Sequence, residues 1–371
     1  MGRLYDLGRG FVAVYCLITC STVILLSFFL VYLPAILIHK NWERHLQTVV
    51  QRLWVYLLLG VTAHVADSTL IVSVPELQDD LTDEQRLRLV QMLSQGFCFP
   101  KQKDVGTVFD SREIIISNHQ LYLDWIYIWS FMSMLGRAGA VKIILKRSLM
   151  NIPFIGLGMR LLNFIFLHRN WEKDRQRFGV RLNRLVHGIF PFSLVIFPEG
   201  TTFCKRAIVK SKAFGVAHKL KVPKHTLIPR VTGMQFALAT LGEHISGIMD
   251  LTLGYTGTKP DEDPEVTFGL KSLFFQGRAP PQIHMHVRFH PIDKIPFQDH
   301  EAFSQWMYER FQEKDRLLDI FYRQGRFPGT SSKPVPVAPA SAIFWIFLAT
   351  GLATFILWTL IGAAIAWCSF R

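Results

Sequence analysis

The strongest constraint on this chain is a pair of long, uncharged apolar stretches, one near each end. The first runs from Phe11 to Ile38 and the second from Ala342 to Phe370. Both exceed the roughly 20 residues that a helix needs to cross the hydrocarbon core of a bilayer. Both are also too long for the core of a signal peptide. The sequence therefore predicts a membrane helix at each end and a folded body between them.

The body is basic and rich in apolar residues. The chain of 371 residues has 41 Lys and Arg against 28 Asp and Glu, which gives a formal net charge of +13. Half of the residues are hydrophobic, and this excludes a disordered chain. A basic body held at a bilayer points to anionic lipid surfaces or to substrates that carry phosphate. Nucleic acid is the alternative partner, but no nucleic-acid-binding motif is present in the sequence, and we expect no nucleic-acid binding.

The cysteines do not form a recognisable framework. Cys16, Cys20 and Cys368 lie in the apolar ends, whereas Cys98 and Cys204 are far apart in the sequence. There is no Cys-x-x-Cys pair, so neither a disulfide scaffold nor a zinc ribbon is expected. The sequence also lacks an Asn-x-Ser/Thr glycosylation site, which argues against a lumenal body.

Flanking charges favour a body in the cytosol. Lys and Arg accumulate on the cytosolic side of membrane helices. The body side of the two stretches carries the larger number of them: Lys40, Arg44, Arg52, Arg323, Arg326 and Lys333, against Arg3, Arg9 and Arg371 on the outer sides.

A second apolar stretch, Leu53–Val65, follows the first one. It is short for a membrane span, so we expect a helix that lies on the membrane or dips into it. Thr82–Gln95 then reads as a soluble helix, because Thr82 and Gln85 form a capping box. Residues 1–65 are thus expected to form the membrane-associated N-terminal part.

The middle of the chain alternates strand-like and helix-like runs. Glu113–Ser117 and Ser193–Phe197 are short, continuous apolar runs typical of buried parallel strands. Residues around Trp125 and the segment Trp171–Ile189 read as helices. Three more strands are expected at Lys142–Leu145, Phe164–Leu167 and Thr226–Pro229. This alternation predicts an α/β fold, with a mainly parallel sheet surrounded by helices.

The C-terminal part has a different pattern. Leu251–Ile292 is more strand-like, and Asp299 is placed to cap a long helix that ends near Gln324. Gly325–Pro339 has the composition of a linker. The expected division is a catalytic domain over residues 66–324, a linker over 325–341 and a C-terminal membrane helix over 342–371.

The first candidate motif follows the strand at Glu113–Ser117 and reads Asn-His-Gln-Leu-Tyr-Leu-Asp. Asp124 comes five positions after His119, so the two cannot share one helix face. They can meet only if His119 lies in the loop and Asp124 in the first helical turn. The carboxylate would then fix the imidazole as a general base toward an alcohol. The alternative is a capped helix start with an incidental histidine.

The second candidate motif follows the strand at Ser193–Phe197 and reads Phe-Pro-Glu-Gly-Thr. Gly200 permits a tight turn, and Glu199 places a carboxylate at the edge of the sheet. The carboxyl ends of parallel strands are where open α/β sheets bind ligands. An ordinary strand-ending turn is the alternative interpretation.

Together, NHxxxxD and FPEGT resemble the motifs of the glycerolipid acyltransferase family, which includes the lysophosphatidate acyltransferases. The resemblance covers residues 110–235 and includes three further blocks: Lys142–Gly156, Phe164–Arg169 and Leu227–Arg230. Trp171–Asp174 and Lys224–Arg230 are similar to the eukaryotic subgroup of lysocardiolipin and lysophosphatidylinositol acyltransferases.

The resemblance implies a role for each site residue. His119 would be the catalytic base and Asp124 its partner, while Arg169, Glu199, Gly200 and Thr201 would bind the acceptor and its phosphate. Many members have Arg after FPEGT, where this chain has Thr202. Contacts to phosphate or to coenzyme A are then expected from other basic residues: Lys142, Lys146, Lys205, Arg206 and Lys210.

The resemblance also implies a reaction. A fatty acyl group would pass from acyl-CoA, as co-substrate, to a glycerol hydroxyl of a lysophospholipid in the bilayer, without a metal or other cofactor. The expected location is the endoplasmic reticulum membrane with a cytosolic catalytic domain. Glycerol 3-phosphate as acceptor, a catalytically silent membrane scaffold and a lipid-transfer module are the alternatives.

One further pattern is a metal-ligand spacing. On a strand, His284, His286 and His290 would share one face. They could bind a metal, although no nearby carboxylate or cysteine completes a set, and a polar strand face is the alternative.

Overall fold

The computed structural model describes residues 7–19, 21, 22, 24, 42–75, 112–152, 155–187, 191–260 and 262–338, together with 351, 355 and 359. The helix expected at Thr82–Gln95, most of the stretch Phe11–Ile38 and nearly all of Ala342–Phe370 lie outside these residues.

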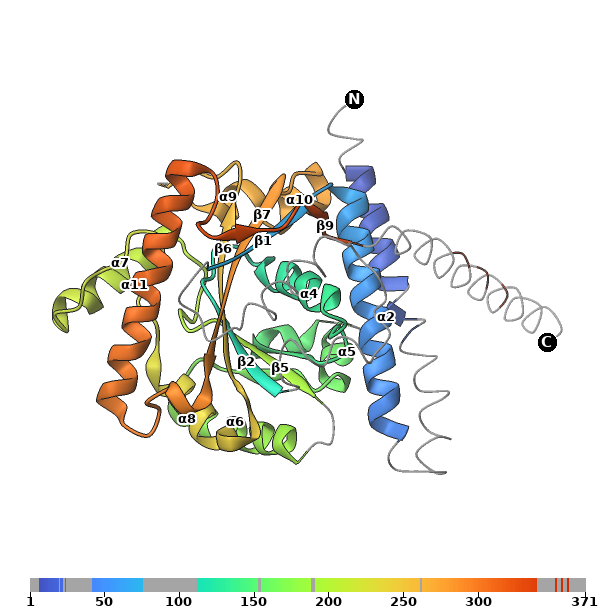
Figure 1. Ribbon diagram of the computed structural model, residues 1–371. Helices are drawn as coiled ribbons and strands as arrows, with labels where there is room; N and C mark the ends of the chain where they lie inside the picture. The colour runs from blue at the N-terminus through green and yellow to red at the C-terminus, as the bar shows by residue number, and fades with distance from the viewer. Residues whose placement is uncertain are drawn as a thin grey trace.

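One mixed sheet forms the centre of the molecule (Figure 1). Its strands run in the order β4-β3-β5-β2-β6-β7-β1-β8, and β9 also pairs with β1. Their bounds are β1 Thr69–Val74, β2 Arg112–Ser117, β3 Val141–Lys146, β4 Ile165–Leu167, β5 Phe192–Ile196, β6 Gly247–Tyr255, β7 Gln282–Pro291, β8 Thr330–Ser331 and β9 Val335–Pro336.

The strands at the site end of the sheet are parallel, as the sequence predicts. β4, β3, β5, β2 and β6 pair with one another in parallel. The sheet becomes mixed beyond β6, because β7 pairs antiparallel to it and β1 then pairs parallel to β7. The carboxyl ends of β2, β4 and β5 therefore meet at one edge, where the candidate motifs follow them.

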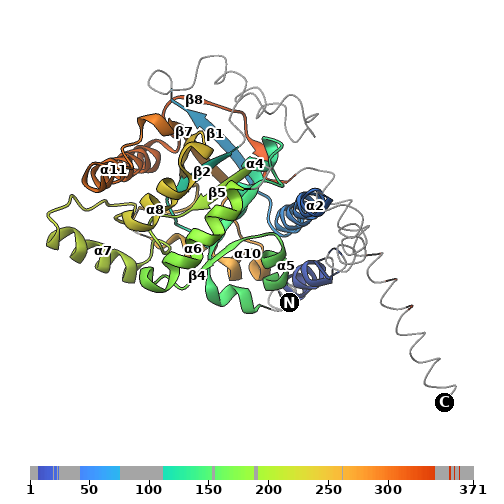
Figure 2. The same cartoon turned by 90° about the horizontal axis from the view of Figure 1, so that it is seen from below.

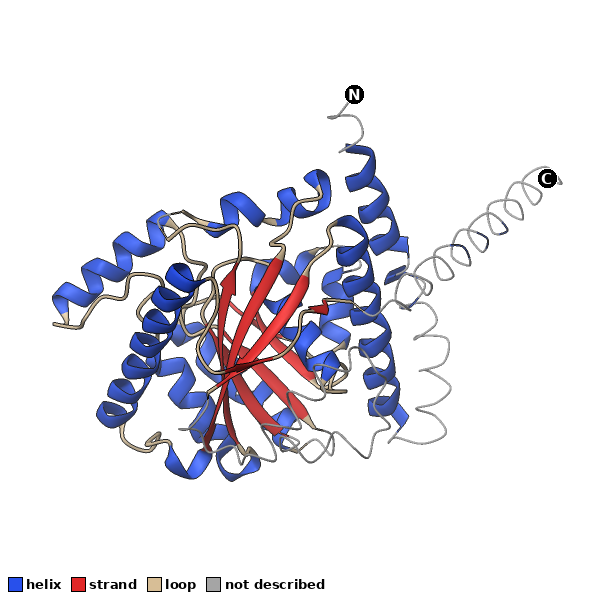
Figure 3. Ribbon diagram, turned by 45° about the horizontal axis from the view of Figure 1, so that its top comes forward, coloured by secondary structure: helices blue, strands red, loops and turns tan. Residues whose placement is uncertain are grey.

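Helices cover both faces of the sheet (Figures 2 and 3). Their bounds are α2 Trp42–Val65, α4 Asp124–Met134, α5 Ile155–Leu161, α6 Trp171–Val186, α7 Lys205–Ala217, α8 Val231–Leu241, α9 Pro264–Phe268, α10 Leu270–Gln276 and α11 His300–Gln324. Short 3-10 turns lie at Arg147–Asn151, Gly242–His244 and Ile292–Lys294.

Successive side chains of β2 point to opposite faces of the sheet, and they are apolar on both faces. Ile115 packs into the core beneath α2 and α4, whereas Ile114 and Ile116 pack into the core beneath α6, α8 and α11. All three side chains are fully buried. Apolar residues on both sides of a strand are characteristic of sheets enclosed by helices.

The second apolar stretch forms a longer helix than the sequence suggests. α2 begins at Trp42, and its segment Leu46–Val65 is long and apolar enough to cross a membrane. Half of that segment is buried against the rest of the protein, as a core helix would be. Its polar Gln51 is buried too and donates to the carbonyl of Val141, 2.5 Å away, so the helix continues through this residue without an unpaired polar group. The helix Leu7–Thr19 packs against α2 through Ala13.

Two expectations about local structure are wrong. Thr226–Pro229 is not a strand: the N–H of Ile228 donates to the Ser211 hydroxyl, and Pro229 has no N–H to offer a neighbouring strand. The Pro-rich segment after α11, expected to be a linker, folds back onto the sheet. β8 and β9 pair with β1, and Val335 and Val337 are buried.

Candidate active site

His119 and Asp124 meet at the end of β2. His119 lies in the loop and Asp124 is the first residue of α4, and His119 Nδ1 is 2.9 Å from Asp124 Oδ2. The same carboxylate accepts hydrogen bonds from the peptide N–H groups of Gln120 and Leu121. The loop therefore wraps around the buried Asp124 side chain, and this brings the imidazole to it. With Nδ1 held, Nε2 is the ring nitrogen available to exchange a proton.

A tyrosine that the sequence does not reveal completes this arrangement. The hydroxyl of Tyr255, at the end of β6, donates to Asp124 Oδ1. Burial and the adjacent carboxylate raise the pKa of Tyr255 well above its ordinary value, so its proton stays on the hydroxyl. Tyr255 is distant from Asp124 in sequence, and only the adjacency of β2 and β6 brings them together.

Glu199 connects the two motif loops. Its Oε1 accepts the N–H of His119 at 3.1 Å, and the N–H of Phe203 donates to the carbonyl of His119 at 2.7 Å. Burial raises the pKa of Glu199 well above its usual range, although N–H groups of His119 and Leu227 oppose that shift. Glu199 therefore holds the backbone next to the histidine, and burial favours its neutral form.

The turn after Glu199 is formed by Gly200 and Thr201. Gly200 has φ +71°, in the left-handed region, and a Cβ at this position would lie 3.1 Å from Arg230 Nε. Both residues line the same cavity as His119. Gly200 is thus needed for the turn and for the close approach of Arg230.

Arg169 follows β4 and also lines this cavity. Its φ is +65°, and the loop around it is held by Asp174 in the first turns of α6. Asp174 accepts hydrogen bonds from the N–H of His168 at 2.8 Å and from the N–H of Asn170 at 3.0 Å. These bonds lower the pKa of Asp174 against the effect of burial, so it is ionised. Burial and the nearby Arg230 lower the pKa of Arg169, as expected for two guanidinium groups that share one space.

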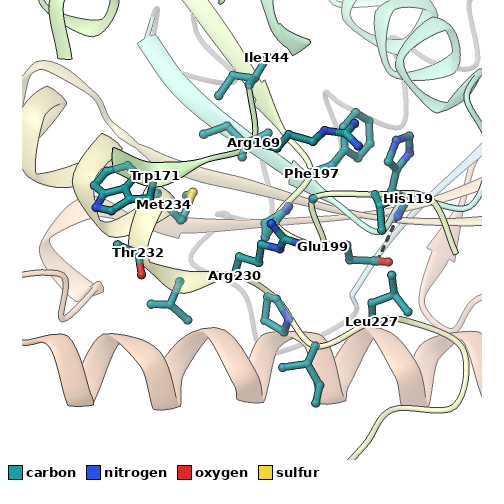
Figure 4. A pocket seen from close by; sticks show the side chains of 18 of the residues that line it. His119, Ile144, Arg169, Trp171, Phe197, Glu199, Leu227, Arg230, Thr232 and Met234 are labelled. Atoms are coloured by element: carbon teal, nitrogen blue, oxygen red, sulfur yellow. Dashed lines mark hydrogen bonds between the residues drawn. The ribbon is translucent and has the colours of Figure 1, made fainter. Parts of the chain in front are cut away.

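One cavity with a volume of about 860 Å³ is lined by His119, Arg169, Glu199 and Arg230. In Figure 4, Arg169 extends toward Phe197 and His119, and Arg230 extends toward the same space from the side of Glu199. The ring of Phe197 stacks on the ring of His119, with centroids 4.1 Å apart. Most of the remaining wall is apolar, with the side chains of Ile144, Leu145, Leu167, Phe178, Ile196 and Val231.

The five additional basic residues divide into three groups. Lys146 and Lys210 line the cavity. Lys205 and Arg206 lie at the start of α7, outside the cavity lining, and Lys205 borders a separate groove. Lys142 is in the wrong place for a ligand contact. Its ammonium group donates to Gln51 of α2 and to the carbonyl of Leu162, and burial lowers its pKa to about 8.

The residue after the second motif, Thr202, differs from the arginine that the resemblance to the family leads us to expect. Thr202 is buried with an exposed fraction of 3 % and cannot supply a cation. Arg230 faces the cavity instead. Arg230 belongs to the sequence block Leu227–Arg230, which marks it as a candidate. Its approach to Gly200 and Arg169 could not be predicted, because these residues are far apart in the sequence.

Three peptide N–H groups in the loop before α4 already have acceptors. Those of Gln120 and Leu121 donate to Asp124, and that of Tyr122 donates to Glu265 Oε2 at 2.7 Å. An oxyanion at the site would need other donors.

The histidines of β7 do not form a metal site. His286 Nδ1 is 3.0 Å from the hydroxyl of Ser73, and His290 pairs with Asp250. Burial lowers the pKa of His286 to about 3, so it is neutral. Within the described part of the chain, no three His, Cys, Asp or Glu residues are placed to hold a metal ion.

Two family models match the chain. Residues 99–233 match the model described as acyltransferase, and residues 273–348 match the model described as acyltransferase C-terminus. The first match contains His119, Asp124, Arg169, Glu199 and Arg230.

Several proteins are similar over the same region. An uncharacterized acyltransferase of Schizosaccharomyces pombe is 35% identical, over 67% of this chain and 69% of its own length. A 2-acyl-1-lysophosphatidylinositol acyltransferase of Saccharomyces cerevisiae is 32% identical, over 61% and 66%. Lysocardiolipin acyltransferase 1 of Gallus gallus is 31% identical, over 62% and 60%. The similarity thus spans about two thirds of the length of these relatives, and it shows that the chain belongs to the glycerolipid acyltransferase family.

Proposed function

We propose that this protein transfers a fatty acyl group from acyl-CoA to a free glycerol hydroxyl of a lysophospholipid, in phospholipid synthesis or remodelling. One observation carries the proposal: His119, which is held by the buried Asp124, lines the same cavity as Arg169 and Arg230. A base beside a phosphate-binding pair of cations suits an acceptor that has both a hydroxyl and a phosphate. Relatives named for lysophosphatidylinositol, lysocardiolipin and 1-acylglycerol 3-phosphate support this acceptor class.

The pair supports a direct transfer. Nε2 of His119 takes the proton of the acceptor hydroxyl while the oxygen attacks the thioester carbonyl. The tetrahedral intermediate collapses when its carbon–sulfur bond breaks, and the departing thiolate takes the proton back from the imidazolium. Asp124 holds the Nδ1–H tautomer and stabilises the transient cation. No covalent acyl-enzyme and no metal or other cofactor is required.

The two arginines bind the phosphate of the acceptor. A planar guanidinium can donate two parallel hydrogen bonds to phosphate, which a lysine cannot do. Arg169 and Arg230 approach from two loops, and Glu199, Gly200 and Thr201 form the turn between them and His119. The apolar wall accommodates acyl chains, and Lys146 and Lys210 face the phosphates of coenzyme A.

A bilayer location follows from the substrates. The acceptor and product are lipids, and the apolar stretches Phe11–Ile38 and Ala342–Phe370 would hold the enzyme beside them, with residues 66–324 as the catalytic domain. Leu46–Val65 adds a third apolar segment. The flanking charges favour a catalytic domain in the cytosol, and acyl-CoA chemistry in phospholipid synthesis fits the endoplasmic reticulum.

The test is a product analysis. Purified full-length protein is incubated with a mixture of lysophospholipids, glycerol 3-phosphate and several acyl-CoAs, and products are read by mass spectrometry. We expect diacyl phospholipids together with an equal amount of released coenzyme A. If glycerol 3-phosphate is acylated and no lysophospholipid is, the acceptor is a soluble molecule and the proposed acceptor class is wrong. Lipid exchange without release of coenzyme A, or no reaction, would contradict the proposal.

A further inference from the structure

Helix α7 projects from the body of the protein (Figures 1 and 3). Among its residues only Ala207 and Gly215 are buried. A stripe this narrow is less than a surface helix of a globular domain normally buries. Most of the helix surface therefore has no partner within the described part of the chain.

The outer surface of α7 is apolar as well as exposed. The side chains of Val209 and Val216 are 67% and 77% exposed. Val209 and Val216 are two helical turns apart and lie on one face, with Lys212 between them. β-Branched side chains that are mostly exposed to water do not stabilise a helix in solution.

The segment that contains α7 carries charge of one sign, whereas Glu262 and Asp263, from another part of the chain, border the groove beside Lys212 and Val216. From Cys204 to Arg230 the sequence has no Asp or Glu. The same interval carries eight cationic residues: Lys205, Arg206, Lys210, Lys212, Lys219, Lys221, Lys224 and Arg230. Exposed apolar residues set among lysines are typical of helices that bind the interface of an anionic membrane.

We propose that α7 binds the surface of an anionic phospholipid bilayer. Val209 and Val216 enter the boundary between headgroups and acyl chains, and the surrounding lysines contact lipid phosphates. The opposite side of the helix supplies Ala207, Ser211 and His218 to the wall of the reaction cavity. A docked α7 therefore brings this wall to the headgroup level, where a lysolipid can enter. This contact is additional to the apolar segments that hold the chain in the membrane.

Photo-crosslinking tests the contact directly. The full-length protein is placed in lipid nanodiscs of phosphatidylcholine alone or with phosphatidylserine, carrying a benzophenone amino acid at position 209 or 216. We expect phospholipid adducts at both positions, more of them with phosphatidylserine, and fewer at high salt because screening weakens surface charge interactions. The readout is mass spectrometry of the labelled peptide, which does not depend on catalytic activity.

The matched control is position 180, an exposed valine of α6 that lies outside this segment and is 49% exposed. Adducts at 180 but not at 209 or 216 would place the membrane against α6 and overturn the proposal. Equal adducts in both lipid mixtures would overturn the requirement for anionic lipid.

A variant that introduces negative charge on this face gives a second measurement. Val209→Glu with Val216→Glu should lower acylation of a lysolipid in phosphatidylserine vesicles by roughly five-fold or more. Turnover with the same lysolipid in detergent micelles should stay at the wild-type level. Equal turnover of variant and wild type on vesicles would contradict the role of α7. If the wild type shows no turnover at all, the proposed reaction fails, and the crosslinks still decide whether α7 binds the membrane.

Discussion

At the residue scale, the site is organised around the Asp124 carboxylate. It accepts from the His119 ring, from the N–H groups of Gln120 and Leu121 and from the Tyr255 hydroxyl. The first three donors are within five positions, so the sequence could predict that His119 and Asp124 meet. Tyr255 comes from another strand, and no local pattern marks it.

Tyr255→Phe tests the donor that the sequence does not reveal. The buried carboxylate would lose one of its donors, so we expect a loss of about 1.5–3 kcal/mol in stability. The same bond orients Asp124 toward His119 during the reaction. Loss of about 1.4 kcal/mol of transition-state stabilisation would lower turnover roughly ten-fold. Rates and melting temperatures measure the two effects.

Tyr127→Phe is the matched control for this change. The Tyr127 hydroxyl is buried next to Tyr255 and has no hydrogen-bond partner among the described residues. Its removal should leave turnover unchanged. Equal losses in the two variants would show that the effect comes from packing and not from the bond to Asp124.

Glu265→Gln tests a titrating contact beside the site. Burial, opposed by its bond from the Tyr122 N–H, raises the pKa of Glu265 from 4.5 to about 7. Because the folded-state pKa is raised, the stabilising contribution is complete below about pH 4.5 and is lost as pH rises through 7. Glutamine keeps an acceptor for Tyr122 and removes the titration, so the melting temperature should fall less between pH 5 and pH 8 than in the wild type. Glu301→Gln, at an exposed position of α11, controls for the loss of one carboxylate. An unchanged pH dependence in Glu265→Gln would refute this interpretation.

At the element scale, loops after parallel strands build the site. The buried runs of β2 and β5 predict these strands correctly, because both are short, continuous apolar segments rich in β-branched or aromatic residues, as strands of enclosed sheets are. The prediction at Thr226–Pro229 is wrong because its apolar residues pack against α7 and its backbone bonds a side chain. Local hydrophobicity does not distinguish a strand from such a loop.

Gly200→Ala tests the turn of the second motif. A left-handed alanine costs about 1 kcal/mol, and its Cβ would press on Arg230. We expect a lower melting temperature and a several-fold higher KM for the acceptor. Gly325→Ala at the end of α11 has the matching φ of +72° in the left-handed region but nothing within 4 Å of the new Cβ. It should lose similar stability and keep its KM, and a raised KM in both variants would contradict the role of Arg230.

At the scale of the whole molecule, the sheet is held between two helical layers. The α/β class follows from the alternation of runs, and the parallel strands near the site agree with it. The sequence could not predict that β7 pairs antiparallel to β6, or that β8, after α11, pairs with β1. Strand order depends on contacts between distant segments, which no local pattern reveals. For the same reason the composition of Gly325–Pro339 suggests a linker, where the structure has a sheet edge.

Lys314→Met tests the attachment of α11 to the sheet. Lys314 is fully buried and its ammonium group pairs with Asp250, which also binds Arg288. Removal of Lys314 takes away one of the cations that compensate the buried Asp250 carboxylate, and should cost about 3 kcal/mol of stability. Lys271→Met, at an exposed position of α10, should have little effect on the melting temperature. Equal, small effects in both variants would mean that the buried ion pair adds nothing to the attachment.

The central claim is that one imidazole removes the proton from a lysophospholipid hydroxyl. The most direct measurement is the rate of acyl transfer by purified His119→Ala with saturating acyl-CoA and lysophospholipid, at matched folding judged by melting temperature. Loss of the general base should lower turnover by roughly 10²–10⁴-fold while acceptor binding through Arg169 and Arg230 persists. Wild-type turnover in this variant would contradict the account.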